Sequence, residues 1–139
     1  MAKILVADDE IDILDLIGFT LQYSGHQVWR ALDGESALEQ ARKVQPDLIV
    51  LDVRMPGLTG YEVCQELKRG EATQAIPVVF ISAKGQEAEV GQGMGLGAED
   101  YILKPFAPDQ LVRRLEQILS QKEARKLNEL TRQWLVEES

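Results

Sequence analysis

The chain has 139 residues, of which 45% are hydrophobic and 27% are charged, and its net charge at pH 7 is −8. This composition is typical of one globular domain and excludes intrinsic disorder and membrane-spanning proteins, and the negative charge argues against direct binding of nucleic acid phosphates. The only cysteine, Cys64, cannot form an internal disulfide bond, and the chain starts without the long apolar segment of a secretory signal. We therefore expect a cytoplasmic protein without membrane contact.

Short apolar runs alternate along the chain with segments of helical spacing. The apolar runs predict five strands, in chain order Lys3–Ala7, His26–Ala31, Leu48–Asp52, Pro77–Ile81 and Asp100–Leu103. The segments of helical spacing predict helices over Ile11–Ser24, Gly34–Val44 and Tyr61–Arg69, a fourth helix near 87–97, and a last helix that begins near Pro108. Because the connections are short, this alternation predicts an α/β fold, a doubly wound five-stranded parallel sheet with helices on both faces.

The fourth predicted helix is interrupted by glycine. Gly91, Gly93, Gly95 and Gly97 occupy every second position. Each interior glycine destabilises a helix by roughly 0.5–1 kcal/mol relative to alanine. We therefore expect this helix to be short or frayed.

Polar side chains stand at the ends of the predicted strands. Asp8 and Asp9 follow the first strand, Asp52 ends the third, and Ser82 and Lys104 follow the fourth and fifth. The carboxyl ends of parallel strands meet at one edge of the sheet, where ligands bind in open α/β folds. Carboxylates gathered there repel one another and need a cation, and Mg²⁺ prefers such oxygen ligands. With a lysine and a hydroxyl they are the groups required to move a phosphoryl group onto a carboxylate. Taken singly, each residue also has an ordinary role, as a helix cap, a strand end or a solvated cation.

The joint pattern resembles the receiver domains of two-component response regulators, including the chemotaxis regulators. The resemblance covers about residues 3–119 and rests on Asp8-Asp9, Asp52 with Met55-Pro56-Gly57, Ser82-Ala83, and Tyr101-Ile102-Leu103-Lys104-Pro105-Phe106. It implies a flavodoxin-like sheet with the strand order 2-1-3-4-5. It also implies that the peptide bond between Lys104 and Pro105 is cis.

The resemblance assigns an acceptor and a metal site. It implies that Asp52 accepts a phosphoryl group from the phosphohistidine of a histidine kinase. It further implies that Mg²⁺ is bound by Asp9, Asp52 and the main-chain carbonyl of Arg54, and that Asp8 acts through a metal-bound water.

The same resemblance assigns a phosphoryl-binding lysine and a switch. Lys104 would bind the phosphoryl group, and Ser82 and Tyr101 would be the switch pair, the hydroxyl moving to the phosphoryl oxygen while the ring turns inward. Arg54 and Lys84 each stand two residues beyond an active-site residue. As long cations over the site they could impede the attacking water and slow self-dephosphorylation, or instead stabilise the departing charge.

The implied function is a phosphorylation-activated switch, whose fourth helix, fifth strand and last helix form the surface that controls a partner. The expected partners are a sensor histidine kinase or histidine phosphotransfer protein and a downstream protein. A phosphorelay shuttle and the receiver part of a longer regulator, with an output domain after residue 139, are alternatives. An aspartyl-phosphate phosphatase is disfavoured because Arg54 stands where a second acid is needed, and a nucleotide-binding enzyme because no glycine-rich phosphate loop follows the first strand. Enzymatic activity is therefore expected only as limited self-phosphorylation and self-dephosphorylation.

The chain continues beyond the part that resembles a receiver, which sets a receiver domain at 1–119 and a helical extension at 120–139. No glycine or proline occurs after Pro108, so one helix of roughly 45 Å is possible, although Ser120-Gln121-Lys122-Glu123 also fits the start of a separate helix. Ala124, Leu127, Leu130 and Trp134 would share one face, which is too short to establish a coiled coil. We expect this face to contact a second copy or a partner helix, giving a possible homodimer; folding back onto the domain and a linker stub are the alternatives.

Overall fold

The computed structural model describes residues 1–83 and 95–138. Its five parallel strands form one sheet in the order β2-β1-β3-β4-β5. The strands are β1 (Lys3–Ala7), β2 (Gln27–Ala31), β3 (Leu48–Asp52), β4 (Val78–Ala83) and β5 (Asp100–Lys104). The helices described in full are α1 (Ile11–Tyr23), α2 (Gly34–Val44), α3 (Gly60–Arg69) and α5 (Pro108–Glu138). The predicted fold class and strand order are confirmed.

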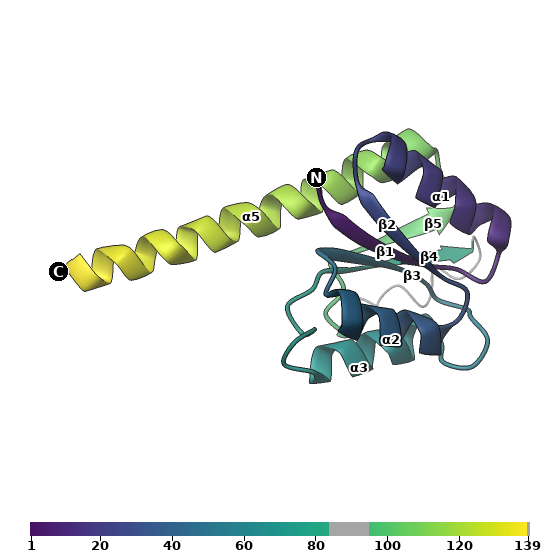
Figure 1. Cartoon of the computed structure of the whole chain (residues 1–139), viewed down its shortest axis with the longest axis horizontal. Helices are drawn as coiled ribbons and strands as arrows, with labels where there is room; N and C mark the ends of the chain where they lie inside the picture. Colours follow the sequence, from purple (N-terminus) through teal and green to yellow (C-terminus); the bar gives the residue numbers. More distant parts are fainter. Residues whose placement is uncertain (84–94, 139) are drawn as a thin grey trace.

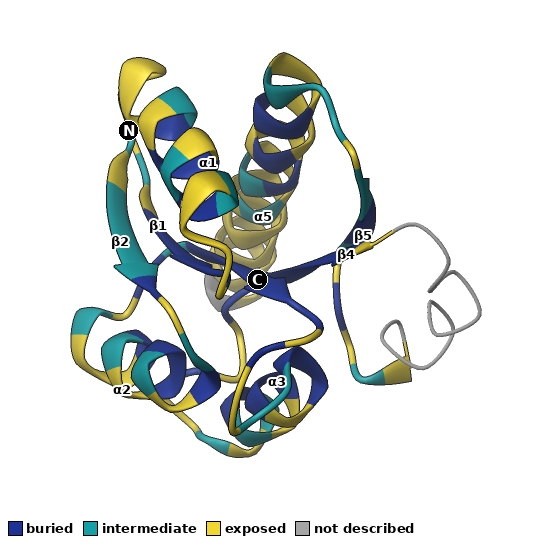
Figure 2. Cartoon of the chain, turned by 90° about the vertical axis from the view of Figure 1, so that its right-hand side faces the viewer, coloured by how far each residue is buried: buried dark blue, intermediate teal, exposed yellow. Residues whose placement is uncertain are grey.

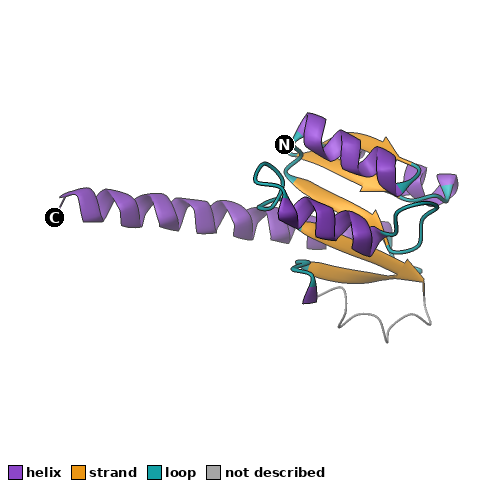
Figure 3. Ribbon diagram, turned by 90° about the horizontal axis from the view of Figure 1, so that it is seen from below, coloured by secondary structure: helices purple, strands orange, loops and turns teal. Residues whose placement is uncertain are grey.

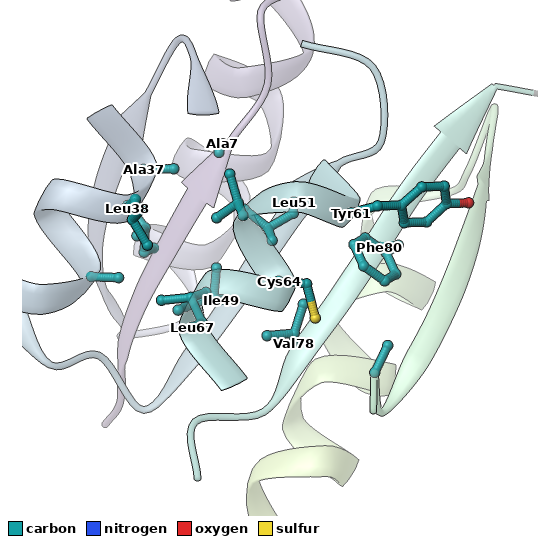
Figure 4. Packing of buried hydrophobic residues seen from close by; sticks show 14 of the residues in the cluster. Ala7, Ala37, Leu38, Ile49, Leu51, Tyr61, Cys64, Leu67, Val78 and Phe80 are labelled. Atoms are coloured by element: carbon teal, nitrogen blue, oxygen red, sulfur yellow. The ribbon is translucent and has the colours of Figure 1, made fainter. Parts of the chain in front are cut away.

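The sheet separates two helical layers, α1 with the first turns of α5 on one face and α2 with α3 on the other (Figures 1 and 2). The side chains of Ile4 and Val6 belong to the cluster with α1 and α5, and those of Leu5 and Ala7 belong to the cluster with α2 and α3. Figure 4 shows the second cluster, in which Phe80 lies beside the ring of Tyr61, a residue of α3. All five residues of β3 are buried, as expected for the central strand of a parallel sheet covered on both faces.

Local sequence signals fix the helix ends next to the sheet edge. The side chain of Thr59 accepts a hydrogen bond from the Glu62 amide, and the Glu62 side chain accepts one from the Thr59 amide, so a capping box starts α3 at Gly60. A Cβ at Gly60 would lie 2.3 Å from the main-chain oxygen of Asp52. The absence of a side chain at Gly60 therefore lets the start of α3 pack directly against the end of β3.

α5 is one continuous helix, so the predicted alternative of a break at Ser120 is not formed. Its second half leaves the domain as a rod (Figures 1 and 3). Arg125 forms an ion pair of 3.6 Å with Glu99, next to β5, so contact with the domain continues past the predicted boundary at residue 119. Of the glycine-interrupted helix predicted near 87–97, residues 87–94 lie outside the described part of the chain.

Within the described residues, no helix combines the length and the apolar character that crossing a membrane would require.

Candidate functional site

Two buried carboxylates stand at the centre of the carboxyl edge of the sheet. Asp8 directly follows β1 and is 0% exposed, and Asp52 ends β3 and is 5% exposed. They are neighbours because the register of β1 and β3 pairs Ala7 with Leu51. Oδ1 of Asp8 accepts a hydrogen bond of 2.9 Å from the main-chain amide of Glu10. This turn brings the Glu10 carboxylate to the site, so that one carboxylate oxygen from each of Asp8, Glu10 and Asp52 lies within 4.8 Å of the others.

Lys104 is the cation of this cluster and comes from the last residue of β5. Its Nζ lies 3.0 Å from Oδ2 of Asp8, 3.1 Å from Oε1 of Glu10 and 3.6 Å from Oδ2 of Asp52. Burial opposes the charged form of Lys104, but its contact with Asp8 and the charges of Asp52 and Asp8 outweigh burial and raise the pKa of Lys104 above its ordinary value. Lys104 therefore stays charged and can hold an anion at this edge. The peptide bond that follows it, to Pro105, is cis as predicted.

The surroundings of Asp52 strongly shift its pKa. Burial, followed by the charge of Asp8, raises the pKa of Asp52 from 3.8 to about 7, although Lys104 and the Arg54 amide act in the opposite direction. A cation that neutralised the Asp8 charge would remove part of this effect. Asp52, which the family resemblance assigns as the phosphoryl acceptor, is thus an acid whose ionisation its surroundings control.

The donor set fits a hard divalent cation. Three carboxylates face one lysine, which leaves an excess of two negative charges when all are ionised. Oδ2 of Asp8 is buried, and its cationic neighbour is the Lys104 ammonium at 3.0 Å. Three carboxylates with one cation are suited to binding a metal ion or a metal-bound water. The described residues therefore contain an acidic cluster that could bind a metal.

The cluster differs in one member from the acids predicted from the sequence. Asp9 is exposed and does not belong to the group of three, whereas Glu10, which we did not predict, does. The signal for Glu10 was its place as the third acid after β1, immediately before α1. Its position depends on the Asp8 turn, which the sequence alone does not specify.

The remaining predicted site residues lie around this centre. Ser82 is fully buried near the end of β4, and the strand register pairs the residue after it with Lys104. Arg54 is exposed, and its amide lies 3.4 Å from Oδ1 of Asp52. Lys84 lies outside the described residues.

Tyr101, the predicted switch residue, lies inward in this structure. Its ring is 8% exposed and its hydroxyl lies 2.9 Å from the hydroxyl of Tyr61 in α3, in a buried hydrogen bond. Both rings pack on Phe80, with centroid distances of 5.0 Å for Tyr61 and 5.9 Å for Tyr101. Sequence reasoning did not identify Tyr61. Its hydroxyl links β5 to the helix that begins eight residues after Asp52.

Comparison with known proteins gives a consistent result. The family described as "Response regulator receiver domain" matches residues 4–116. The alkaline phosphatase synthesis transcriptional regulatory protein PhoP of Bacillus subtilis is 44% identical over 121 residues, which are 87% of this chain and 50% of that protein. The phosphate regulon transcriptional regulatory protein PhoB of Escherichia coli is 41% identical over 117 residues, 84% of this chain and 51% of that protein. This chain thus spans about half the length of the curated relatives it matches.

Solved structures of similar size also match. The chemotaxis response regulator CheY4 of Vibrio cholerae superposes with a TM-score of 0.80 and 33% identity, covering 85% of this chain and 98% of that one. A response regulator from Chloroflexus aurantiacus superposes with a TM-score of 0.82 and 34% identity, covering 86% of this chain and 98% of that one. The similarity therefore extends over the sheet and its helices.

Proposed function

We propose, because this chain belongs to the family of response regulator receiver domains, that Asp52 is the residue through which it acts as a phosphorylation-activated switch. The observation that carries the proposal is the pairing of buried Asp52 with Asp8 and Lys104 at the carboxyl edge of the sheet. A carboxylate there has a neighbouring cation for an incoming anion and a neighbouring acid that favours metal binding. These are the requirements of phosphoryl transfer to an aspartate.

In the proposed reaction an ionised Oδ atom of Asp52 attacks the phosphorus of a phosphohistidine. The new P–O bond forms as the P–N bond breaks, and the histidine nitrogen keeps the electron pair. Lys104 holds the transferring oxygens, and the hydroxyl of Ser82 donates to one of them. A bound Mg²⁺ would supply charge neutralisation; its proposed ligands are Asp52 and the main-chain carbonyl of Arg54, with Asp8, Asp9 or Glu10 completing the set. Only the ionised Asp52 attacks, and without metal its pKa is raised to about 7 by burial and the charge of Asp8, so a bound Mg²⁺ should favour the ionised form and thereby promote uptake.

The proposed partners follow from this chemistry. A histidine kinase or a histidine phosphotransfer protein supplies the phosphoryl group, and a downstream protein reads the surface near β5 and α5. A second copy, bound through the C-terminal half of α5, is a further proposed partner. Direct contact of this chain with nucleic acid is not expected, because its net charge is −8.

A second candidate is the receiver part of a longer regulator. The coverage of the relatives favours it, since this chain aligns with about half of each. One of them is named as the DNA-binding dual master transcriptional regulator RpaA of Synechocystis. In that case the switch would act on an attached output domain. A phosphorelay shuttle remains a third reading.

The test is uptake from a small phosphodonor. Incubation with acetyl phosphate and Mg²⁺, followed by intact mass measurement, should show one added phosphate, and none should appear with Asp52→Asn or after removal of divalent metal. A phosphate adduct that persists in Asp52→Asn would contradict the assignment. Self-phosphorylation of this kind is a limited activity and does not require the kinase.

Two matched variants decide which acid completes the metal site. Glu10→Gln should raise the Mg²⁺ concentration needed for uptake if the observed cluster binds the ion, and Asp9→Asn should do so if the ligand set implied by the family holds. Both remove one negative charge within two residues of Asp8. The exposed Asp12→Asn, one turn further on, controls for loss of charge alone.

Arg54 and Lys84, each two residues beyond an active-site residue in the sequence, are proposed to set the lifetime of the phosphorylated state. Arg54→Asn and Lys84→Glu should each speed loss of the phosphoryl group if these side chains impede water. Unchanged or slower decay in both variants would refute shielding, and slower decay would favour stabilisation of the departing charge.

A further inference from the structure

The C-terminal half of α5 carries large apolar side chains in water. Leu127 is 64% exposed, Leu130 54%, Trp134 60% and Leu135 56%. These four residues are here called the apolar strip. Leu127, Leu130 and Trp134 lie on one side of the helix because they are spaced by three and four residues, and Leu135, next to Trp134, widens that side. A cluster of this size on an exposed rod marks an interaction surface more often than an ordinary monomer surface.

The apolar strip does not face its own domain. At 3.6 residues per turn, its mean direction lies about 130° around the helix from the buried residues of the first half of α5. Those residues are Leu111, Val112, Leu115 and Ile118. Since α5 is one continuous helix, the strip cannot pack on the domain without a break in the helix. A helix that covers the apolar strip would therefore belong to another molecule.

The charges of the extension change sign along its length. Residues 120–126 contain three basic residues and one acidic residue, whereas residues 127–138 contain three acidic residues and one basic residue. Two parallel copies would bring like charges together at both ends of the contact. At 3.6 residues per turn, Lys126 lies at the flank of the strip, whereas Lys122 and Arg125 lie towards the domain. Two antiparallel copies would bring Lys126 of each helix beside the acidic end of the other, and this complementarity favours a second copy as the occupant.

A groove at the base of the domain continues the line of the apolar strip. It has a volume of about 420 Å³ and lies between α5 and the amino-terminal edge of the sheet, where Ala2, His26 and Asp47 line it. On the helix it is lined by Ser120 and Glu123 among others, which precede Leu127 by two turns and one turn on the same side of α5. A helix lying antiparallel along the strip would therefore bring its end to this groove.

We propose that the apolar strip binds the apolar strip of a second copy in antiparallel orientation, with the acidic end of each helix beside Lys126 of the other. The two receiver domains then lie at opposite ends of the paired helices, and both phosphoryl sites face away from the contact. The pairing does not require phosphorylation. Its failure would consequently leave the proposed function of Asp52 untouched.

The first experiment measures mass in solution. Light scattering of the unphosphorylated full chain at high micromolar concentration should give a dimer, and Trp134→Glu should give a monomer. The matched control is Gln133→Glu, which adds the same charge one residue away and off the strip, and should remain dimeric. A monomeric wild-type protein, or a dimer unaffected by Trp134→Glu, would overturn the proposal.

The second experiment tests the orientation. A charge-exchanged chain carrying Lys126→Glu and Glu137→Lys keeps complementary ends in an antiparallel pair of its own kind. Mixed at low salt with a differently tagged wild-type chain, it should form few mixed dimers, because each basic end would then meet a basic end. A parallel arrangement predicts the reverse, a preference for mixed dimers. Random or preferential mixing would overturn the antiparallel arrangement.

Discussion

At the carboxyl edge of the sheet, Asp8 and Asp52 hold carboxylates away from water, whereas along the end of α5 Leu127 and Trp134 hold apolar side chains in water. The first arrangement is unfavourable because burial disfavours charge. The second is unfavourable because contact between apolar surface and water raises the free energy. A particular binding partner would relieve each unfavourable arrangement. For the buried carboxylates it is a cation with a phosphoryl group, and for the exposed apolar side chains it is an apolar helix. In both regions, a locally unfavourable arrangement of side chains marks the place where a binding partner is expected.

The largest effect is expected when the buried charge is removed. The folded pKa of Asp52, about 7, is above its ordinary value of 3.8, so the folded state binds the proton more tightly than the unfolded state does. The stabilisation is complete below about pH 4 and is lost as the pH rises through 7, amounting to at most about 4 kcal/mol by pH 8 at about 1.4 kcal/mol per pKa unit. Asp52→Asn should therefore be more stable than wild type at pH 8 without metal, and similar to it at pH 4.

Urea unfolding with a chelator at several pH values measures this difference. Because Asp8 and Asp52 interact, the plot of unfolding free energy against pH reports the titration of the pair. Mg²⁺ at pH 8 should raise the unfolding free energy of wild type more than that of Asp52→Asn. The exposed Glu39→Gln on α2 is the control, and its curve should run parallel to that of wild type. A parallel curve for Asp52→Asn would mean that its burial does not disfavour the charge.

The helices and strands were predictable because their signals are local, whereas the strand order came from the family resemblance. The four apolar residues before Asp52 identified β3, and the bounds of β1 and α2 agree with those predicted. α3 begins one residue earlier than predicted because the capping box places its start at Gly60. The continuity of α5 was left open because a capping sequence at Ser120 and an uninterrupted helix are both compatible with the residues there.

The site was predictable to the extent that it follows from strand ends. Asp8, Asp52 and Lys104 come together because parallel strands align their carboxyl ends. Glu10 and Tyr61 could not be found in this way. Glu10 reaches the cluster through a turn, and Tyr61 meets Tyr101 across forty positions of the chain.

An intermediate effect is expected from the buried tyrosine pair. Tyr61→Phe leaves the Tyr101 hydroxyl in an apolar setting without this partner, which costs about 1–3 kcal/mol of unfolding free energy unless the ring turns outward to water. Tyr101→Phe should cost a similar amount. The double variant should cost less than the sum, because neither hydroxyl is then left behind.

The double-mutant cycle in urea gives the coupling energy directly. Tyr23→Phe, at a residue that is 95% exposed, should change the unfolding free energy by no more than about 0.5 kcal/mol. Additive effects of Tyr61→Phe and Tyr101→Phe would show that the hydroxyl pair does not hold Tyr101 inward. A measured coupling would instead make Tyr61 a positioning residue for the switch.

The smallest effect should come from the ion pair where the two regions meet. Arg125 and Glu99 are 3.6 Å apart, and their side chains are 61% and 33% exposed, so solvent screening limits the pair to roughly 0.2–1 kcal/mol. Arg125→Gln should lower the unfolding free energy of the domain by that amount or less. Arg113→Gln breaks an ion pair with Asp109 that lies within α5 and is exposed on both sides, which makes it the matched control. Arg125 also joins the extension to Glu99, which directly precedes β5 and lies two positions before Tyr101. If that contact fixes the helix against the domain, Arg125→Gln should increase hydrogen exchange of the amides in 120–130 more than Arg113→Gln does. Equal exchange in both variants would mean that helix continuity alone sets the rigidity of the extension.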